Sequence, residues 1–295
     1  MAKKAAFITG GVSGMGLAVA QELSSRTNED WDLHLIDLNS EAGKKVTTTL
    51  KNAYFRQTNV TDWDSIISAF EYAFSISGRI DFVFANAGIV ERDNFYAKHD
   101  LGKPPPPPNQ LSIDINLKAV VNTCYAALHY FRKSPKNGID PVLICTASCG
   151  GLYPSEFCPM YSAAKAGIIH FNQAISYSYH SEGIRTYATA PGTIVTGLLS
   201  GDEWKSFPEQ YFTPMSTLVK AVTYILDGGD MEDSRGKKIP AKEAYGLTVE
   251  VNRDSFYFRE KNAFCDADME AMMKYTSMEN QLARIEKTKA GGSGV

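Results

Sequence analysis

Apolar residues along this chain gather into short continuous runs that alternate with longer segments of helical periodicity. The short runs predict strands at 5–9, 32–37, 53–58, 81–85, 141–147, 184–189 and 245–251. The periodic segments predict helices at 14–26, 40–51, 62–77, 110–133, 160–182 and 214–227. Continuous apolar strands are typical of a parallel sheet covered on both faces, and their alternation with helices favours right-handed βαβ units. The pattern predicts an α/β fold with a doubly wound parallel sheet of about seven strands.

Residues at the predicted boundaries agree with this interpretation. Asp62 can cap the helix that follows it, and Thr213-Pro214 has the order of an N-cap followed by proline. Gly183 stands where a helix would end before the next strand. Neither a repeat nor a linker interrupts the pattern, so we expect one domain over residues 1–253.

Three stretches depart from the alternation. Residues 89–109 form an insertion that ends in five consecutive prolines, which must be extended because proline fixes φ and lacks an amide donor. We expect a stiff spacer or flap edge there, with a ligand for a proline-recognising module as the alternative. Residues 192–213 form a second long loop, and 254–295 form an extension with a helix over 266–288 and a disordered end at 291–295.

Composition narrows the class of protein. A chain of 295 residues with 44% hydrophobic content can bury a sizeable core, and a net charge of −3 gives no basic stripe for nucleic acid or an anionic membrane. The five cysteines are odd in number and lack metal-ligand spacing, so we expect reduced thiols and no metal. With neither a signal-peptide pattern nor a run of ~18 apolar residues, we expect a cytoplasmic protein.

A glycine-rich turn follows the first predicted strand and opens a helix at Thr9–Gly16. Backbone amides are free at a helix start, and glycine lets a phosphate approach them closely. An ordinary tight turn is the alternative. We expect this loop to bind the pyrophosphate of a dinucleotide through Gly10, Val12, Ser13, Gly14, Met15 and Gly16.

Asp37 ends the second predicted strand, at the separation from Gly16 expected of an acid that binds the adenine ribose. A carboxylate there accepts from the ribose 2′-hydroxyl and repels a 2′-phosphate. Because Leu38 and Asn39 follow it and no arginine does, the sequence favours NAD over NADP. A helix-capping or surface aspartate is the alternative.

Tyr161 and Lys165 stand four residues apart on a predicted helix, so their side chains share a face. A free tyrosine titrates near ~10, and a neighbouring cation would lower its pKa and make it a better base. This spacing alone is common, and a solvated helix face is its usual explanation.

The glycine loop, Asn86-Ala87-Gly88 after the fourth predicted strand and Tyr161–Lys165 occur together in order. In this the chain resembles the short-chain dehydrogenase/reductase superfamily, from residue 5 to about residue 250. The resemblance implies a Rossmann-type fold and a catalytic set of Ser148, Tyr161, Lys165 and Asn116. It implies further cofactor contacts at Leu38, Asn59, Val60, Asn86, Ala87, Gly88, Tyr161, Lys165, Pro191, Gly192, Ile194 and Thr196.

The resemblance also implies a role for each catalytic residue. Ser148 would hold the substrate oxygen, and Tyr161, as a phenolate, would take the alcohol proton. Lys165 would lower the tyrosine pKa and bind the nicotinamide ribose, while Asn116 would position a water that links Lys165 to solvent. Thr196 would hold the nicotinamide carboxamide.

Within the superfamily the chain is similar to 15-hydroxyprostaglandin dehydrogenase and its fungal relatives, in Leu35-Ile36-Asp37 and in Ala147–Pro154. Two departures are visible. Asn59 replaces the usual aspartate that touches adenine, from which we expect an altered affinity, and Ala85 replaces the first asparagine of the Asn-Asn-Ala-Gly motif.

Aromatic and apolar residues beside Tyr161 and in the 192–213 loop indicate a hydrophobic secondary alcohol or ketone as substrate. Simple packing of the loop against the body is the alternative. Candidate substrate contacts are Ser148, Tyr153, Cys158, Leu198 and Trp204. The resemblance implies a homodimer built on helices 110–133 and 160–182, with a tetramer as the alternative. Other interpretations of the function are a ketoreductase of a secondary-metabolite pathway and a non-redox cofactor-binding protein.

Overall fold

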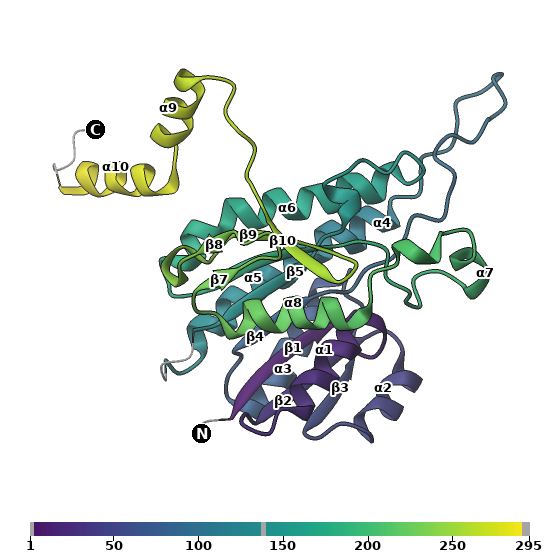
Figure 1. Ribbon diagram of the computed structural model, residues 1–295, viewed down its shortest axis with the longest axis horizontal. Coiled ribbons are helices and arrows are strands. Elements are labelled where there is room, and N and C mark those ends of the chain that lie inside the picture. Colours follow the sequence, from purple (N-terminus) through teal and green to yellow (C-terminus); the bar gives the residue numbers. More distant parts are fainter. Residues whose placement is uncertain (1–2, 137–139, 291–295) are drawn as a thin grey trace. The chain divides into compact units, whose positions relative to one another are not determined.

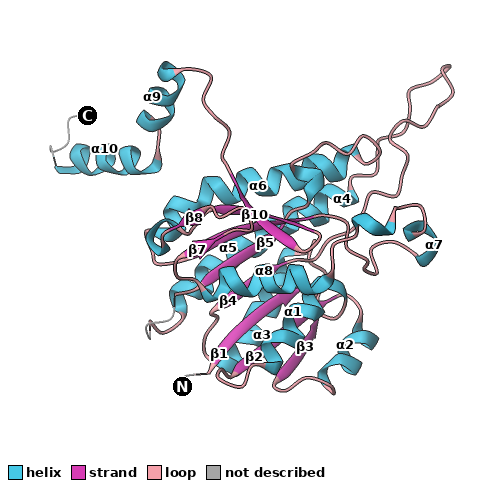
Figure 2. Cartoon of the chain, viewed as in Figure 1, coloured by secondary structure: helices cyan, strands magenta, loops and turns pink. Residues whose placement is uncertain are grey.

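Parallel strands form the centre of the fold. The computed structural model describes residues 3–136 and 140–290 (Figures 1 and 2). Within those ranges eight strands form one sheet in the order β10-β9-β6-β5-β4-β1-β2-β3. The strands are β1 (Lys4–Thr9), β2 (Trp31–Asp37), β3 (Ala53–Gln57), β4 (Phe82–Ala85), β5 (Val142–Thr146), β6 (Arg185–Pro191), β9 (Leu247–Asn252) and β10 (Ser255–Arg259).

The strand order reverses beside β1, which pairs in parallel with β2 on one side and with β4 on the other. β5, β6 and β9 continue the parallel pairing beyond β4. In an open α/β sheet, ligands bind in the crevice outside the carboxyl ends of the strands at such a reversal. The α/β class with a doubly wound parallel sheet is therefore confirmed.

The strand count of about seven was one short, because β10 extends the sheet beyond β9. Only two residues, Arg253 and Asp254, connect these strands, and so short a connection joins antiparallel neighbours. Arg253 takes the positive φ of 51° that the tight turn needs. Phe256 and Phe258 alternate with partly exposed neighbours and are buried, so the compact unit runs to Phe258, past the predicted boundary at residue 253.

Helices cover both faces of the sheet, and successive residues of β1 point to opposite faces. Ala6 and Ile8 lie in a core cluster with residues of α1 and α8, whereas Phe7 lies in a second cluster with residues of α3, α5 and α6. This is the two-residue period of a strand buried on both sides. The helices of this unit are α1 (Gly14–Ser25), α2 (Ser40–Thr47), α3 (Trp63–Ser77), α4 (Leu111–Ile113), α5 (Ala119–Lys133), α6 (Pro159–His180), α7 (Gly201–Trp204) and α8 (Met215–Asp227).

Two predicted helices differ from the expected ranges. The helix expected over 40–51 ends at Thr47, where the hydroxyls of Thr47, Thr48 and Thr49 donate to carbonyls three residues back. The helix expected over 110–133 is divided into α4, a π-helical stretch (Asp114–Lys118) and α5. Single π-helical turns are frequent at functional sites.

Two of the three predicted boundary signals are confirmed. Asp62 Oδ1 accepts from the amides of Asp64 and Ser65 and caps α3, and Gly183 has a φ of +80° beyond the end of α6. The third was wrong by one residue. Pro214 itself is the N-cap of α8, and Thr213 Oγ1 accepts from the amide of Arg253 at 2.9 Å.

The remaining segments surround this frame. Residues 92–110 are exposed throughout, and the 192–213 loop contains α7 and a 3-10 turn (Glu209–Tyr211). Other short elements are the 3-10 turns Cys149–Gly151 and Ala241–Glu243 and the paired strands β7 (Met231–Glu232) and β8 (Lys238–Ile239).

The second compact unit contains two helices, α9 (Ala267–Tyr275) and α10 (Met278–Ala290), in place of the single one predicted over 266–288. The predicted disordered end, 291–295, lies outside the described residues. In 3–136 and 140–290, no helix combines the length and the apolar character needed to cross a membrane.

Candidate active site

The glycine loop joins β1 to α1 in a conformation that only glycine allows at its close contacts. Gly10 and Gly14 have φ of +64° and +49°. A Cβ on Gly16 would lie 2.3 Å from the Gly10 carbonyl oxygen, and the N-cap, Ser13, makes no side-chain cap hydrogen bond. The first turn of α1 thus offers uncapped amides beside a bare backbone surface, a cradle that fits a diphosphate.

Asp37 lies beside this loop at the end of β2. Its Oδ2 accepts from the Val12 amide at a long 3.4 Å, and its Oδ1 accepts from the Asn39 amide at 3.0 Å. Exposed Leu38 follows it. The carboxylate is thus held at the edge of the loop, where it can accept from a ribose hydroxyl.

Asn59 uses its side-chain oxygen within its own turn. Oδ1 accepts from the Thr61 amide at 3.1 Å and from the Thr61 hydroxyl at 2.8 Å. Val60 is half-buried and packs against the core cluster of α3 and α5. Both bonds need only an acceptor oxygen, which an aspartate would also supply, so the departure from the usual aspartate has no explanation in these contacts.

Asn86 ties together the carboxyl ends of three strands. Its side-chain Nδ2 donates to the Thr9 carbonyl on β1, and its Oδ1 accepts from the Thr146 hydroxyl on β5. Gly88 follows where a Cβ would lie 2.8 Å from Asn116 Oδ1. The Asn86–Gly88 segment therefore holds the edge of the crevice in a fixed position.

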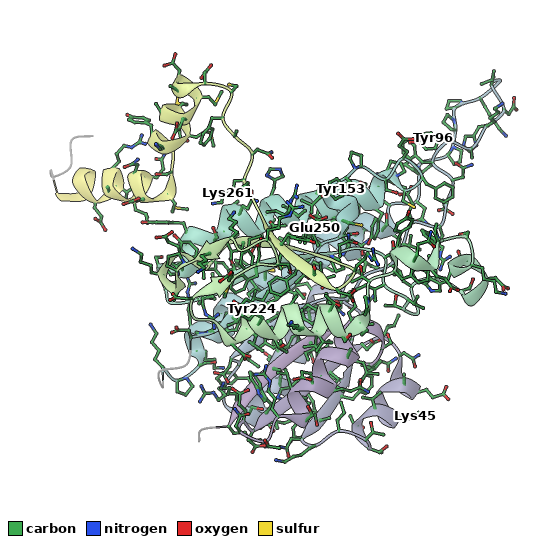
Figure 3. All side chains as sticks on the ribbon, viewed as in Figure 1. Lys45, Tyr96, Tyr153, Tyr224, Glu250 and Lys261 are labelled. Atoms are coloured by element: carbon green, nitrogen blue, oxygen red, sulfur yellow. The ribbon has the colours of Figure 1, made fainter. Side chains whose placement is uncertain are left out.

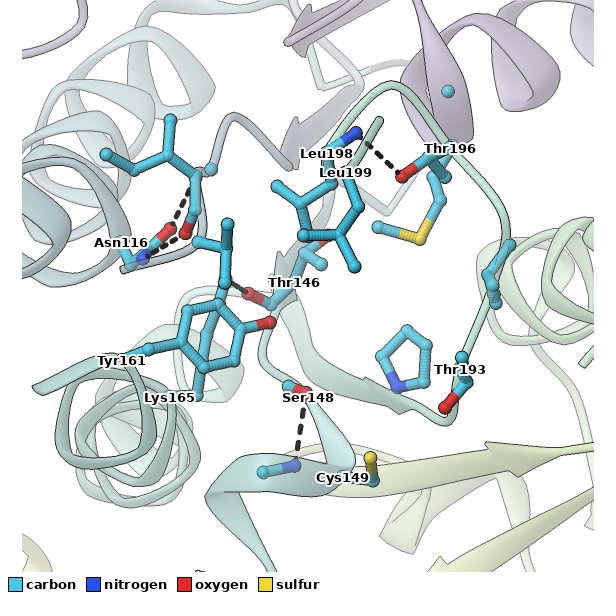
Figure 4. A pocket seen from close by; sticks show the side chains of 18 of the residues that line it. Asn116, Thr146, Ser148, Cys149, Tyr161, Lys165, Thr193, Thr196, Leu198 and Leu199 are labelled. Atoms are coloured by element: carbon cyan, nitrogen blue, oxygen red, sulfur yellow. Dashed lines mark hydrogen bonds between the residues drawn. The ribbon is translucent and has the colours of Figure 1, made fainter. Parts of the chain in front are cut away.

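Ser148, Tyr161 and Lys165 face one another across this crevice (Figure 4). Ser148 follows β5 and accepts from the Gly150 amide at 3.1 Å. Burial raises the pKa of Tyr161, and its hydrogen bond with Ser148 opposes that rise. With protein groups alone around it, the phenol is therefore held in its neutral form.

Lys165 lies one helical turn beyond Tyr161 on α6 and is almost fully buried. Its Nζ donates to the Thr146 carbonyl at 2.7 Å and lies 5.8 Å from the centre of the Tyr161 ring. Burial lowers the pKa of Lys165 to about 8. With a pKa this close to neutral pH, the protonation of Lys165 changes with small changes in the charge around it.

Asn116 is fully buried in the π-helical stretch. Its Nδ2 donates to the Ile89 carbonyl at 2.8 Å, and its Oδ1 accepts from the Ile89 amide at 3.0 Å. The side chain of Asn116 thus anchors the segment after Gly88, and its expected role in positioning a water stays a prediction. A direct side-chain bond to Lys165 is not among the hydrogen bonds of the described residues.

These groups open onto one cavity of about 620 Å³ at the carboxyl ends of the strands. Most of the residues predicted for the site line it. They are Gly10, Ser13, Gly14, Met15, Asn86, Ala87, Gly88, Asn116, Ser148, Cys158, Tyr161, Lys165, Pro191, Gly192, Ile194, Thr196, Leu198 and Trp204.

Seven predicted residues do not line this cavity: Val12, Gly16, Tyr153, Asp37, Leu38, Asn59 and Val60. Val12 and Gly16 belong to the glycine loop, Asp37 and Leu38 lie at and just after the end of β2, and Asn59 and Val60 lie just before α3. Tyr153 departs from its expected role in substrate contact. It is exposed, and its hydroxyl donates to Glu250 Oε2 at 3.2 Å (Figure 3). Its closeness to Tyr161 in sequence did not determine the direction of its side chain.

Arg92 lines the cavity although it belongs to none of the motifs in the sequence. Its guanidinium donates to the Leu198 carbonyl at 2.8 Å and pairs with Glu203 at the start of α7. Trp204 Nε1 donates to the Thr196 carbonyl at 3.0 Å. The two contacts of Arg92 join the 89–109 insertion to the 192–213 loop, whereas the Trp204 bond lies within that loop, and both segments contribute walls of the site.

Comparison with known proteins agrees with this architecture. The sequence model for the short chain dehydrogenase family matches residues 4–205. The protein described as short-chain dehydrogenase/reductase prx7 of Penicillium rubens is 43% identical over 281 residues, which cover 92% of this chain and 99% of that relative. The NAD(+) 15-hydroxyprostaglandin dehydrogenase of Homo sapiens is 27% identical over 234 residues, covering 76% of this chain and 81% of that enzyme.

Solved structures share the fold. Levodione reductase superposes with a TM-score of 0.68 at 23% identity, covering 84% of this chain and 96% of that chain. The 3-ketoacyl-(acyl-carrier-protein) reductase of Brucella melitensis, solved with NADH, gives a TM-score of 0.67 at 20% identity with the same coverage. The resemblance inferred from the glycine loop and the tyrosine–lysine pair is confirmed, and the chain belongs to the short-chain dehydrogenase family.

Proposed function

We propose that this protein is an NAD-dependent oxidoreductase that transfers a hydride between a hydrophobic secondary alcohol or its ketone and nicotinamide. The observation that carries the proposal is the convergence of Ser148, Tyr161 and Lys165 on one cavity that is continuous with the glycine loop. Their chemistry matches proton transfer from a carbinol hydroxyl, and a purely binding protein has no need of the set.

In the oxidative direction the residues have separate tasks. The Ser148 hydroxyl donates to the substrate oxygen and orients it. The Tyr161 oxygen, in its phenolate form, accepts the hydroxyl proton and becomes a phenol, and Lys165 stabilises that phenolate by its positive charge. When bound, NAD+ supplies the hydride acceptor and a positive charge near the phenol. That charge opposes the effect of burial on the pKa of Tyr161.

NAD is favoured over NADP by Asp37. Its carboxylate is held beside the glycine loop, where it would accept from a 2′-hydroxyl and repel a 2′-phosphate. The name of the human relative includes NAD(+), which agrees with this choice. Gly10, Ser13 and Gly14 would hold the diphosphate, and Thr196 would hold the carboxamide end.

The substrate side of the cavity favours an apolar alcohol. Leu198, Leu199, Trp204 and Phe207 line it from the 192–213 loop, and Cys158 lines it from the start of α6. Such a lining binds a hydrocarbon body by burial and leaves orientation to a few polar groups. A ketoreductase that runs the same chemistry in reverse fits this lining equally well, since hydride transfer is reversible.

Reduced-nicotinamide formation tests the proposal. Purified protein is assayed with NAD+ or NADP+ against a panel of hydrophobic secondary alcohols and the matching ketones, beside Tyr161→Phe. We expect turnover with NAD+ that Tyr161→Phe lowers by about 100-fold or more. Tight NADH binding without turnover on any alcohol or ketone would instead favour the non-redox interpretation.

Assembly as a homodimer through α5 and α6 is a further part of the proposal. Tyr125 on α5 is 70% exposed and packs against Trp63 of α3, so an aromatic surface is open on this side. Sedimentation that shows only monomer at micromolar concentration would contradict a dimer. The cytoplasmic location expected from the sequence stays a prediction.

A further inference from the structure

The helix that carries Tyr161 begins without a cap of its own. Its N-cap residue, Cys158, makes no side-chain cap hydrogen bond, and Pro159 has no amide hydrogen. The next two amides, of Met160 and Tyr161, both donate to Oε2 of Glu91, at 2.9 and 3.1 Å. The Glu91 carboxylate, although distant in the sequence, therefore caps the N-terminus of α6.

Glu91 is buried, with 8% of its surface exposed. A carboxylate is seldom buried unless its charge is compensated. Here two amide hydrogens and the positive end of the α6 dipole provide that compensation. Its second oxygen, Oε1, is buried and lacks a hydrogen-bond partner in the described part of the chain. The side chain thus depends on these two amides for its polar contacts.

The backbone around Glu91 is fixed on both sides. Two residues earlier, Ile89 exchanges two hydrogen bonds with the amide of Asn116. One residue later, the Arg92 guanidinium donates to the Leu198 carbonyl and pairs with Glu203. The backbone that carries Glu91 is therefore fixed by contacts on both sides. Through its bonds to α6, Glu91 can hold the first turn of that helix in place.

We propose that Glu91 is a positioning residue for Tyr161, an inference that rests on the function proposed above. The first turn of a helix frays most readily, and Tyr161 lies in the first turn of α6. Holding the Tyr161 amide fixes its Cα, and with it the direction of the phenol toward Ser148 and Lys165. Glu91 itself does not line the cavity, so it acts through Tyr161 and does not touch the substrate.

Two substitutions separate positioning from simple stabilisation. Glu91→Ala removes both acceptors, whereas Glu91→Gln keeps an oxygen that can accept from both amides. Glu156→Ala is the matched control, because this exposed carboxylate lies in the loop just before the same helix. Hydrogen exchange of a peptide spanning 158–166, NADH affinity and kcat per NADH-binding site are measured in each variant.

We expect faster exchange in Glu91→Ala, a fall in kcat of about 10- to 100-fold and NADH affinity within about twofold of wild type. Glu91→Gln is expected to restore kcat to within about threefold of wild type, and Glu156→Ala to change none of the three readouts. A purely structural cap would lower thermal stability without changing kcat per binding site.

Three outcomes would overturn the proposal. Unchanged exchange in Glu91→Ala would show that the two amides do not depend on this carboxylate. Faster exchange with unchanged kcat per site would reduce Glu91 to a structural cap. A wild-type protein that binds NADH but turns over neither alcohols nor ketones would remove the proposed function and the positioning role together, and this result is distinct from the first two.

Discussion

The side chain of Asn116 and the backbone of Ile89 exchange two hydrogen bonds, with Nδ2 donating to the Ile89 carbonyl at 2.8 Å and the Ile89 amide donating to Oδ1 at 3.0 Å. This contact joins the π-helical stretch before α5 to the segment that leaves β4. A Cβ added to Gly88 would lie 2.8 Å from Asn116 Oδ1 and 3.5 Å from Lys165 Nζ, so the segment passes close to both side chains.

Asn116→Leu should weaken NADH binding by about 10-fold and lower the stability, because it leaves both Ile89 backbone groups unpaired at about 1–3 kcal/mol. A fluorescence titration with NADH and a thermal melt measure the two effects. Asn122→Leu makes the same change on α5, at a side chain without a hydrogen bond among the described residues, and is the control. Wild-type NADH affinity in Asn116→Leu would mean that the anchor is dispensable for cofactor binding.

Lys165→Met should lower kcat by about 100-fold or more. The same substitution should stabilise the cofactor-free protein at neutral pH. The pKa of Lys165 is lowered to about 8 from an ordinary 10.5, so folding disfavours its charged form. Between those values the unfolded chain binds a proton that the folded chain lacks, and wild-type stability therefore rises with pH.

The melting temperatures of wild type and Lys165→Met are compared from pH 7 to pH 10. We expect the variant to melt higher at pH 7, by about 2–4 °C for each kcal/mol gained. The difference in melting temperature between the two proteins should narrow as the pH rises past about 8. A variant that melts lower than wild type at pH 7 would show that the lost bond to the Thr146 carbonyl outweighs the buried charge, and a difference that does not narrow with pH would contradict the lowered pKa of Lys165.

Asp37→Ala should reduce the preference for NAD+ over NADP+ by about 10- to 100-fold, since hydrogen bonds to a charged group contribute about 1.5–3 kcal/mol. The change in kcat/KM for each cofactor, at a fixed alcohol concentration, measures it. Asp64→Ala, an exposed carboxylate in the first turn of α3, controls for the loss of charge alone. An unchanged ratio would exclude Asp37 from ribose recognition.

Arg92→Ala should raise KM for the alcohol by about 3- to 10-fold while NADH affinity stays unchanged. The substitution removes the bond to the Leu198 carbonyl and the pair with Glu203, so the 192–213 loop loses its tie to the insertion. Lys205→Ala, which breaks the exposed pair with Asp202 beside α7, should leave KM as in wild type. If both variants have the same KM for the alcohol, the contacts of Arg92 do not contribute to substrate binding.

Local spacing was enough to select the glycine loop and the Tyr161–Lys165 pair, while Ser148 and Asn116 came from the family resemblance. Gly10–Gly16 and Tyr161–Lys165 are short motifs whose geometry a single turn or helix determines, and the cavity brings most of them together. The sheet followed from the apolar runs, apart from β10, whose Phe256 and Phe258 we left unassigned.

Contacts between segments that are distant in the sequence could not be predicted from residue spacing. Glu91 and Arg92 meet α6 and the 192–213 loop only after the chain has folded, and neither residue belongs to a motif. Tyr153 shows the converse, because it is near Tyr161 in sequence but hydrogen-bonds Glu250 outside the cavity. Such side-chain directions depend on tertiary packing, which residue spacing does not encode.

Gly16→Ala offers the sharpest test of the cofactor loop. The added Cβ would lie 2.3 Å from the Gly10 carbonyl oxygen and 2.9 Å from Asn86 Nδ2, and neither atom belongs to the end of a long flexible side chain. Overpacking of this kind costs about 1–3 kcal/mol, and it would move the loop away from the conformation that exposes its amides. We therefore expect lower thermal stability and NADH binding weakened by about 100-fold.

The control for this prediction is Gly201→Ala, where an added Cβ meets nothing within 4 Å at the start of α7. That variant should melt and bind NADH as wild type does, since alanine is a better helix former than glycine. Isothermal titration with NADH and thermal melts compare the two proteins. If Gly16→Ala keeps wild-type affinity, the close approach of α1 to the Gly10 turn is not what creates the cofactor cradle, and the assignment of the loop must be revised.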